Sequence, residues 1–235
     1  MQVRKIINSF FFWISFLIFF CEVAFVHAQR FNAGFSLGAV ASDIHGMDQR
    51  DRDNDFNKLG FTVGGIVNTK VNEKNIFQME INYIQKGSMQ NPDSAHMDYY
   101  KFVADYVDVA LLFRHHMKFT IRKSVIDRFD WEAGVSIGRM VRNTWTSSLG
   151  NSYSTAIDES KINKTDISPL IGLDYNLSSK VCLGIRYSNS VIPVIKHDAY
   201  PGYLIWYNVN IGNNLAAQFF LKVVFGGTAH QESHD

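Results

Sequence analysis

Apolar residues alternate with small or polar residues in eight separate segments of the chain, and this pattern constrains the fold more than any other feature. The segment Asn75–Lys86 reads NIFQMEINYIQK, with a large apolar or aromatic residue at every second position from Phe77 to Tyr83. Successive side chains of a strand point to opposite faces, so such a segment suits a strand with lipid on one face and a polar lumen on the other. The eight segments are Arg30–Ala41, Lys58–Thr69, Asn75–Lys86, Asp105–Met117, Phe129–Ile137, Asp166–Leu177, Val181–Ser188 and Asn214–Phe225.

The links between these segments alternate in length. Two are short, Lys70–Lys74 and Asn176–Lys180, and a third, Lys118–Arg128, is longer than a tight turn. The other four links are long and polar, and they cover residues 42–57, 87–104, 139–165 and 189–213. Short periplasmic turns and long outer loops are what a membrane barrel with a periplasmic N-terminus requires.

No apolar run after residue 28 is long enough for a membrane helix, so any spanning must be done by a closed sheet. The sequence therefore predicts an all-β fold, an eight-stranded antiparallel transmembrane β-barrel with short periplasmic turns and long extracellular loops. A β-sandwich or a soluble lipocalin-like barrel is the alternative, although a sandwich has no reason to keep its long loops at one end.

The first 28 residues have the features of a secretory signal peptide. Arg4 and Lys5 precede the apolar stretch Phe10–Phe20, and a cleavage site fits after Ala28. A permanent anchor helix is the alternative, which the shortness of the apolar stretch disfavours. We expect a cleaved signal peptide over residues 1–28, an outer-membrane barrel over 29–225 and a short periplasmic tail over 226–235.

Removal of the signal peptide leaves equal numbers of basic and acidic side chains in the mature chain. A neutral chain without a basic block offers no electrostatic footprint for nucleic acid, so no nucleic-acid partner is expected. Cys182 is then the one remaining cysteine, which predicts that there is no intramolecular disulfide.

Charged residues at inward positions predict a filled lumen. Eight strands enclose an interior that side chains just fill, and buried charges must be paired. Inward glycines, such as Gly172 and Gly184, leave room for long charged side chains. We therefore expect a structural ion-pair network across the lumen; a proton or ion path through its carboxylates is the alternative. The expected members are Glu80, Asp108, Arg114, Glu132, Arg186 and Lys222.

Few residues suggest chemistry. His115 and His116 are adjacent, so on a regular strand they point to opposite faces and cannot bind one metal ion; a solvated barrel rim is the expected location. His197 and Asp198, with Ser188 or Ser190, have the residue types of a hydrolase triad, but the chain has no Gly-x-Ser-x-Gly elbow. An exposed loop histidine is the favoured interpretation.

The acidic stretch Asp48–Asp55 has the composition of a calcium loop but lacks the glycine and terminal glutamate of the EF-hand pattern. A charged, solvated loop is favoured over weak divalent-ion binding. We predict no catalytic residue, no metal site and no cofactor.

Five aromatic residues fall near the predicted strand ends, where aromatic girdles of membrane barrels contact the bilayer interfaces. They are Tyr83, Tyr106, Trp131, Tyr175 and Tyr187.

Four segments in order resemble the PorT-like outer-membrane β-barrel family of Bacteroidota. They are Gly34–Gly38 (GFSLG), Lys58–Gly64 (KLGFTVG), Gln78–Gly87 (QMEINYIQKG) and Tyr106–Leu112 (YVDVALL). The third is the most specific, because it ends a strand in Tyr-x-x-Lys-Gly just before a long outer loop. Ala110 departs from the family, which usually has proline there. The resemblance spans the mature chain from Phe31 to Phe225.

Members of this family include the PorT and PorG components of the type IX secretion system. The resemblance implies a non-enzymatic scaffold or anchor in the outer membrane, with secretion-system subunits of the periplasm or outer membrane, and outer-membrane lipid, as partners. The tail or the Lys118–Arg128 link is the expected contact with a partner. A small outer-membrane channel, an envelope-maintenance barrel and a lipid-modifying enzyme are the alternatives.

Overall fold

The computed structural model describes residues 31–45, 56–91, 99–121, 124–147, 160, 162–195 and 212–225. The expected signal peptide over residues 1–28, the expected tail over 226–235 and the acidic stretch 48–55 lie outside these residues. The division of the chain into those parts therefore stays a prediction.

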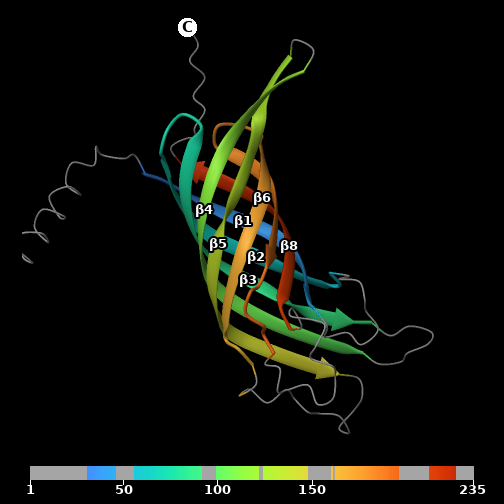
Figure 1. Ribbon diagram of the computed structural model, residues 1–235. Helices are drawn as coiled ribbons and strands as arrows, with labels where there is room; N and C mark the ends of the chain where they lie inside the picture. Colours follow the sequence, from blue (N-terminus) through green and yellow to red (C-terminus); the bar gives the residue numbers. More distant parts are fainter. Residues whose placement is uncertain are drawn as a thin grey trace, which may run out of the picture. The chain divides into compact units, whose positions relative to one another are not determined.

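Eight antiparallel strands form a closed barrel in which each strand pairs with its neighbours along the chain (Figure 1). β1 also pairs with β8, with Ala33 opposite Phe225 and Ile44 opposite Asn214, which closes the ring. The predicted all-β, eight-stranded fold is confirmed. The strands are β1 (Phe31–Ile44), β2 (Lys58–Lys70), β3 (Asn75–Gln90), β4 (Tyr100–Ile121), β5 (Ser124–Ser147), β6 (Thr165–Asn176), β7 (Val181–Asn189) and β8 (Asn214–Phe225).

The alternation of residue types separates the two faces of the barrel wall. Outward-facing apolar side chains are exposed, among them Leu37, Ile81 and Ile185, which suits contact with lipid hydrocarbon. Inward positions hold many buried polar and charged side chains, including Glu80 and Lys222. Within the described residues, no helix is long and apolar enough to cross a membrane.

The two ends of the barrel differ in how they connect the strands. At the end that we call the turn end, residues 71–74 join β2 to β3 and residues 177–180 join β6 to β7. Asn72 Oδ1 accepts the backbone N–H of Asn75 at 2.9 Å, and Ser178 holds the second turn in the same way. Such side-chain bonds favour Asn and Ser in tight turns. The opposite end, the loop end, carries the long connections 45–57, 91–99, 148–164 and 190–213.

β4 and β5 extend beyond the rest of the sheet at the turn end. β3 pairs with β4 as far as His115, and β6 pairs with β5 as far as Phe129. β4 and β5 stay paired with each other up to Ile121 and Ser124. The predicted strand ends at Met117 and Phe129, with residues 118–128 as the link between them, are therefore wrong.

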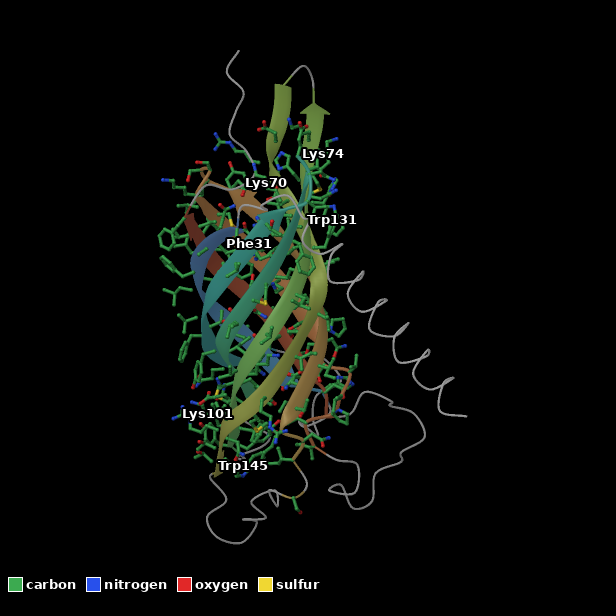
Figure 2. The ribbon with its side chains drawn as sticks, turned by 90° about the vertical axis from the view of Figure 1, so that its left-hand side faces the viewer. Phe31, Lys70, Lys74, Lys101, Trp131 and Trp145 are labelled. Carbon is green, nitrogen blue, oxygen red and sulfur yellow. The ribbon has the colours of Figure 1, made fainter. Side chains whose placement is uncertain are left out.

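This projecting hairpin, residues 117–121 of β4 and 124–128 of β5, stands beyond the barrel rim in both views of the chain (Figures 1 and 2). The sequence from 117 to 121 is Met-Lys-Phe-Thr-Ile, which keeps the two-residue period of a strand. Its backbone continues the β4–β5 ladder with no neighbouring strand on either side in the part of the chain that the structure describes.

Apolar side chains fill the lumen at the loop end. Most come from inward positions of the strands, but Ile162, Val194 and Ile195 come from the connections, and Ile162 and Ile195 meet in an isolated antiparallel bridge. We call this cluster the apolar plug. Its members are Val40, Ile44, Ile84, Phe102, Ala104, Tyr106, Met140, Ile162, Val194, Ile195 and Ala216.

Candidate functional site

The middle of the lumen is built around Arg186 of β7. Its two terminal nitrogens each lie 2.9 Å from one oxygen of Glu80, and its Nε lies 2.8 Å from Glu132 Oε1. All three side chains are almost completely buried. A planar guanidinium matches a carboxylate with two parallel hydrogen bonds, which fixes geometry as well as charge. Arg186 therefore ties together β3, β5 and β7 across the lumen.

Lys222 of β8 joins a third carboxylate to this centre. Its Nζ lies 2.7 Å from Glu132 Oε2, 3.1 Å from Asp174 Oδ2 and 3.8 Å from Glu80 Oε1. The ring of Phe220 lies beneath both cations, 4.5 Å from Lys222 Nζ and 4.8 Å from the Arg186 guanidinium carbon. Contact with an aromatic face stabilises a desolvated cation.

The small residues of the wall make this arrangement possible. A Cβ at Gly172 would lie 2.8 Å from Glu132 Oε1, and a Cβ at Gly184 would overlap the Phe220 ring and the Asp174 carboxylate. The space that a side chain would take at these two positions is occupied by the ion pairs and by Phe220.

The network continues toward the turn end through Arg114. One of its terminal nitrogens lies 2.9 Å from Asp174 Oδ2 and 2.9 Å from Asp130 Oδ2, and the other donates to Gln78 Oε1 at 3.1 Å. Asp130 Oδ1 in turn lies 2.6 Å from Nδ1 of His116.

The prediction of a solvated barrel rim is wrong for His116, which is 4% exposed. His116 continues the inward series of β4 beyond Arg114, and Asp130 stands opposite it on β5. His115 faces outward, so the two imidazoles lie on opposite faces of β4 as predicted. It is half-buried, with its ring 5.7 Å from that of Trp131 and its Nδ1 2.6 Å from Asn75 Oδ1.

Of the six residues predicted to pair in the lumen, the structure brings five into one network: Glu80, Arg114, Glu132, Arg186 and Lys222. Asp108 is buried, but it forms no ion pair with any of the described residues. Its Oδ1 has no hydrogen-bond partner among these residues. Asn82, which lies opposite Asp108 on β3, donates its amide to Glu80 Oε2 at 3.1 Å instead.

Three further carboxylates at inward positions, Asp130, Asp166 and Asp174, form ion pairs that were not predicted. Asp130 and Asp174 bind Arg114, as described above. Asp166 pairs with Lys86 at 3.0 Å and also accepts a hydrogen bond from Asn214, closer to the loop end. The alternation of apolar and polar residues places these carboxylates on the inward face, but it does not indicate which strands lie opposite one another across the lumen.

Tyr106 departs from the predicted aromatic girdle. It is 1% exposed, and its hydroxyl accepts a hydrogen bond of 3.1 Å from Asn214 inside the lumen. Residues 106 and 108 are two positions apart on β4, so their side chains point to the same face of the strand. Asp108 points into the lumen, and Tyr106 therefore does so too. Trp131 faces outward at the turn end, where its ring contacts Phe113 (5.8 Å between centroids). Tyr175 lies there too, against Phe129 (5.1 Å).

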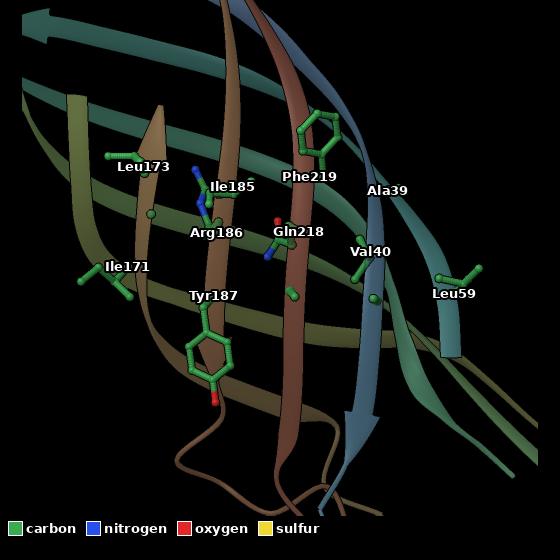
Figure 3. Close-up of a pocket in the computed structure, with 13 residues that line it drawn as sticks. Ala39, Val40, Leu59, Ile171, Leu173, Ile185, Arg186, Tyr187, Gln218 and Phe219 are labelled. Carbon is green, nitrogen blue, oxygen red and sulfur yellow. The ribbon is translucent and has the colours of Figure 1, made fainter. Parts of the chain in front are cut away.

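An apolar hollow of about 680 Å³ lies along the barrel wall across β6, β7, β8, β1 and β2 (Figure 3). Small residues make the wall concave between larger side chains such as Leu59, Phe219 and Tyr187. Arg186 and Gln218 also border it, but the Arg186 guanidinium is engaged in the lumen. A hollow with this lining suits hydrocarbon. Its small residues are Ala39, Ala41, Gly172 and Ala217.

The residues that a triad would need are not brought together by anything that the structure describes. His197 and Asp198 lie outside the described residues, and Ser188 and Ser190 are buried. Among the described residues, no group of three or more His, Cys, Asp or Glu side chains is placed to hold a metal ion.

Comparison with known proteins gives one family match. The family model of the outer membrane protein beta-barrel domain matches residues 27–196. No curated protein matches the sequence.

Several solved structures are similar in outline. Ail, the attachment invasion locus protein of Yersinia pestis, in complex with the heparin analogue sucrose octasulfate, has 10% sequence identity and a TM-score of 0.43, with 84% of this chain and 100% of that chain covered. Neisserial surface protein A has 11% identity and a TM-score of 0.42, with 83% and 97% covered. OprG of Pseudomonas aeruginosa has 11% identity and a TM-score of 0.26, with 84% and 91% covered.

Proposed function

The chain belongs to the outer membrane protein beta-barrel domain family, and from this premise we propose that it is a non-enzymatic component of a protein secretion apparatus of the type IX kind. In this role the barrel anchors secretion subunits of the periplasm or outer membrane. The short connections of the turn end face the periplasm, and the long connections of the loop end face outward, as in other outer-membrane barrels.

The packed lumen is the observation that carries a scaffold role over a channel role. Ions entering from the loop end meet the apolar plug, and ions entering from the turn end meet carboxylates already engaged by Arg114, Arg186 and Lys222. The small gap lined by Glu80, Arg186 and their neighbours has no room for a water-sized sphere. A lumen filled in this way supports a barrel whose outer surfaces and ends perform the function.

The resemblance of four segments to the PorT-like family supports the secretion apparatus as the setting. The most specific of them, Gln78–Gly87, contributes Glu80 to the ion-pair network and ends at Gly87, whose φ of 143° favours glycine. The projecting hairpin adds a surface on the periplasmic side that is available to a partner.

Deletion of the gene tests this proposal. We expect the deletion strain to lose exported proteins from the culture medium, measured by quantitative mass spectrometry, and a plasmid copy of the gene to restore them. We also expect the purified barrel to give no single-channel steps in planar lipid bilayers. Unchanged export in the deletion strain would exclude the secretion role, and regular conductance steps would favour a small channel instead.

A further inference from the structure

The projecting hairpin has an open backbone edge on β4. His116 N–H donates to the carbonyl oxygen of Lys74 (2.8 Å), which is where pairing on the β3 side ends. Backbone N–H groups of a strand point to alternate sides, so Lys118 and Thr120 direct their N–H groups to the same side as His116. Among the described residues, no strand pairs with this edge, which runs for about 17 Å at the usual rise per residue.

The opposite edge, on β5, is interrupted. Met117 lies opposite Phe129 and Phe119 lies opposite Ile126, so β5 has one more residue than β4 between these two pairs. This bulge at Asp127 and Arg128 breaks the regular spacing of donors and acceptors, as bulges do on protected sheet edges. The β4 edge is therefore the regular one.

The charges around the β4 edge are mainly positive. Lys118 is exposed on the hairpin. Lys74, which is labelled in Figure 2, is exposed in the turn that leads into β3. The sequence from 118 to 128 contains four basic residues and one acidic residue, Asp127. A second copy of this hairpin would bring like charges together and would be repelled. An acidic chain would be attracted.

The hairpin also lies beyond the level at which the barrel contacts lipid. Trp131 and Tyr175 are the outward aromatic residues of the turn end. Trp131 lies opposite His115, where the pairing of β4 with β3 ends, and Tyr175 lies opposite Phe129, where the pairing of β5 with β6 ends. Phe119 is farther along β4 and is 45% exposed. A two-stranded hairpin in water is marginal by itself, and a third strand on one edge stabilises it.

We propose that the β4 edge of the projecting hairpin binds an extended, acidic segment of a periplasmic protein, which adds to the sheet as a third strand. Main-chain hydrogen bonds to Lys118 and Thr120 supply the pairing, as in other cases of strand addition. Lys74 and Lys118 select the acidic sequence, and Phe119 contacts an apolar residue of the segment. This inference rests on the proposed scaffold function and names the partner's chemistry for it.

Photo-crosslinking in the cells that produce the protein tests the inference. The full-length chain carries the photoreactive residue p-benzoylphenylalanine in place of Phe119, and the crosslinked peptide is identified by mass spectrometry. We expect an adduct to a segment of a periplasmic protein with net negative charge. An adduct to lipid only, to a second copy of this chain or to a basic segment would overturn the inference, as would the absence of any adduct.

A pair of proline variants in the same background tests the edge. Thr120→Pro removes an N–H that points away from β5, and its cross-strand partner Val125 offers the matched control. Directly opposed residues point their N–H groups both inward or both outward, so Val125→Pro removes an N–H from the β5 edge instead. We expect Thr120→Pro to lower the crosslinking yield about tenfold and Val125→Pro to leave it within about twofold. Equal effects of the two prolines would overturn the assignment to the β4 edge.

Export measured in the same strains separates this inference from the proposed function. If the deletion strain stops exporting proteins but Thr120→Pro crosslinks and exports as the wild type does, the strand-addition site is wrong and the secretion role stands. If the deletion strain exports normally while the crosslinks behave as expected, the secretion role is wrong and the binding site stands.

Discussion

Near the loop end the inward positions of the strands hold Val40, Ile44 and Phe102, whereas from the middle to the turn end they hold Glu80, Glu132 and Arg114. Both regions are buried and both close the lumen. The apolar plug packs by the non-directional hydrophobic effect, so neighbouring arrangements of similar volume are nearly as favourable. The ionic region depends on defined partners at hydrogen-bond distance.

The two regions make different contributions to the structure of the barrel. A slip of one residue in strand register would turn Glu80 or Arg186 toward lipid and leave its partners unpaired, which is far more costly than exchanging one aliphatic residue for another. The ionic region therefore fixes the register of β3, β5, β7 and β8. The apolar plug excludes water and joins the connections to the strands.

Arg186→Met should destabilise the barrel more than any other single substitution considered below. It leaves Glu80 and Glu132 buried with Lys222 as their one remaining cationic partner among the described residues. Removing one partner of a buried pair costs about 3–5 kcal/mol. The free energy of unfolding, measured by urea titration of the barrel in lipid vesicles, should fall by that amount. The double variant Arg186→Met, Glu132→Gln should lose less than the two single losses combined. If Arg186→Met were as stable as the wild type, the ionic region would not determine the strand register.

Ile195→Ala in the apolar plug should cost less, about 2 kcal/mol, because the connections around it can partly collapse into the cavity. Ile171→Ala, on the outward face, is the matched control, since lipid refills the space that it leaves. Urea titration of both variants measures the difference. If Ile195→Ala costs no more than its control, the apolar plug is loosely packed and adds little to the stability of the barrel.

His116→Ala should have the smallest effect, a loss of about 1 kcal/mol, because Asp130 keeps Arg114 at 2.9 Å after the imidazole is removed. The same titration measures it, with Arg186→Met as the reference. A loss as large as that of Arg186→Met would mean that the ion pairs at the turn end stabilise the barrel as much as those in the middle of the lumen.

Strand number, order and facing were predictable because membrane barrels impose the two-residue period on every strand. The facing of residue 116 followed from the same period, but the apparent end of the strand at Met117 suggested a solvated rim and hid the burial of His116. The ends of β4 and β5 were missed for the same reason, since the alternation continues past the level of the lipid.

The pairing across the lumen was only partly predictable. Arg186 reaches Glu80 and Glu132 from strands that are not its neighbours, and no local pattern reports such a distance. The plug residues Ile162 and Ile195 lie in connections without a regular period, so no pattern indicates that their side chains enter the lumen. Tyr106 was predicted at the bilayer interface because it is aromatic, although the alternation along β4 places it on the inward face.

The pairing of β1 with β8 has a consequence for biogenesis. Ala33 meets Phe225, so the first and last strands hold each other and the ring cannot close before the C-terminal strand has been delivered. Contacts between such distant parts of a chain form slowly. Until then the outward-facing Phe31, Leu37 and Phe219 have no lipid to contact in an aqueous compartment. The newly exported chain must therefore be kept from aggregating until its final strand arrives.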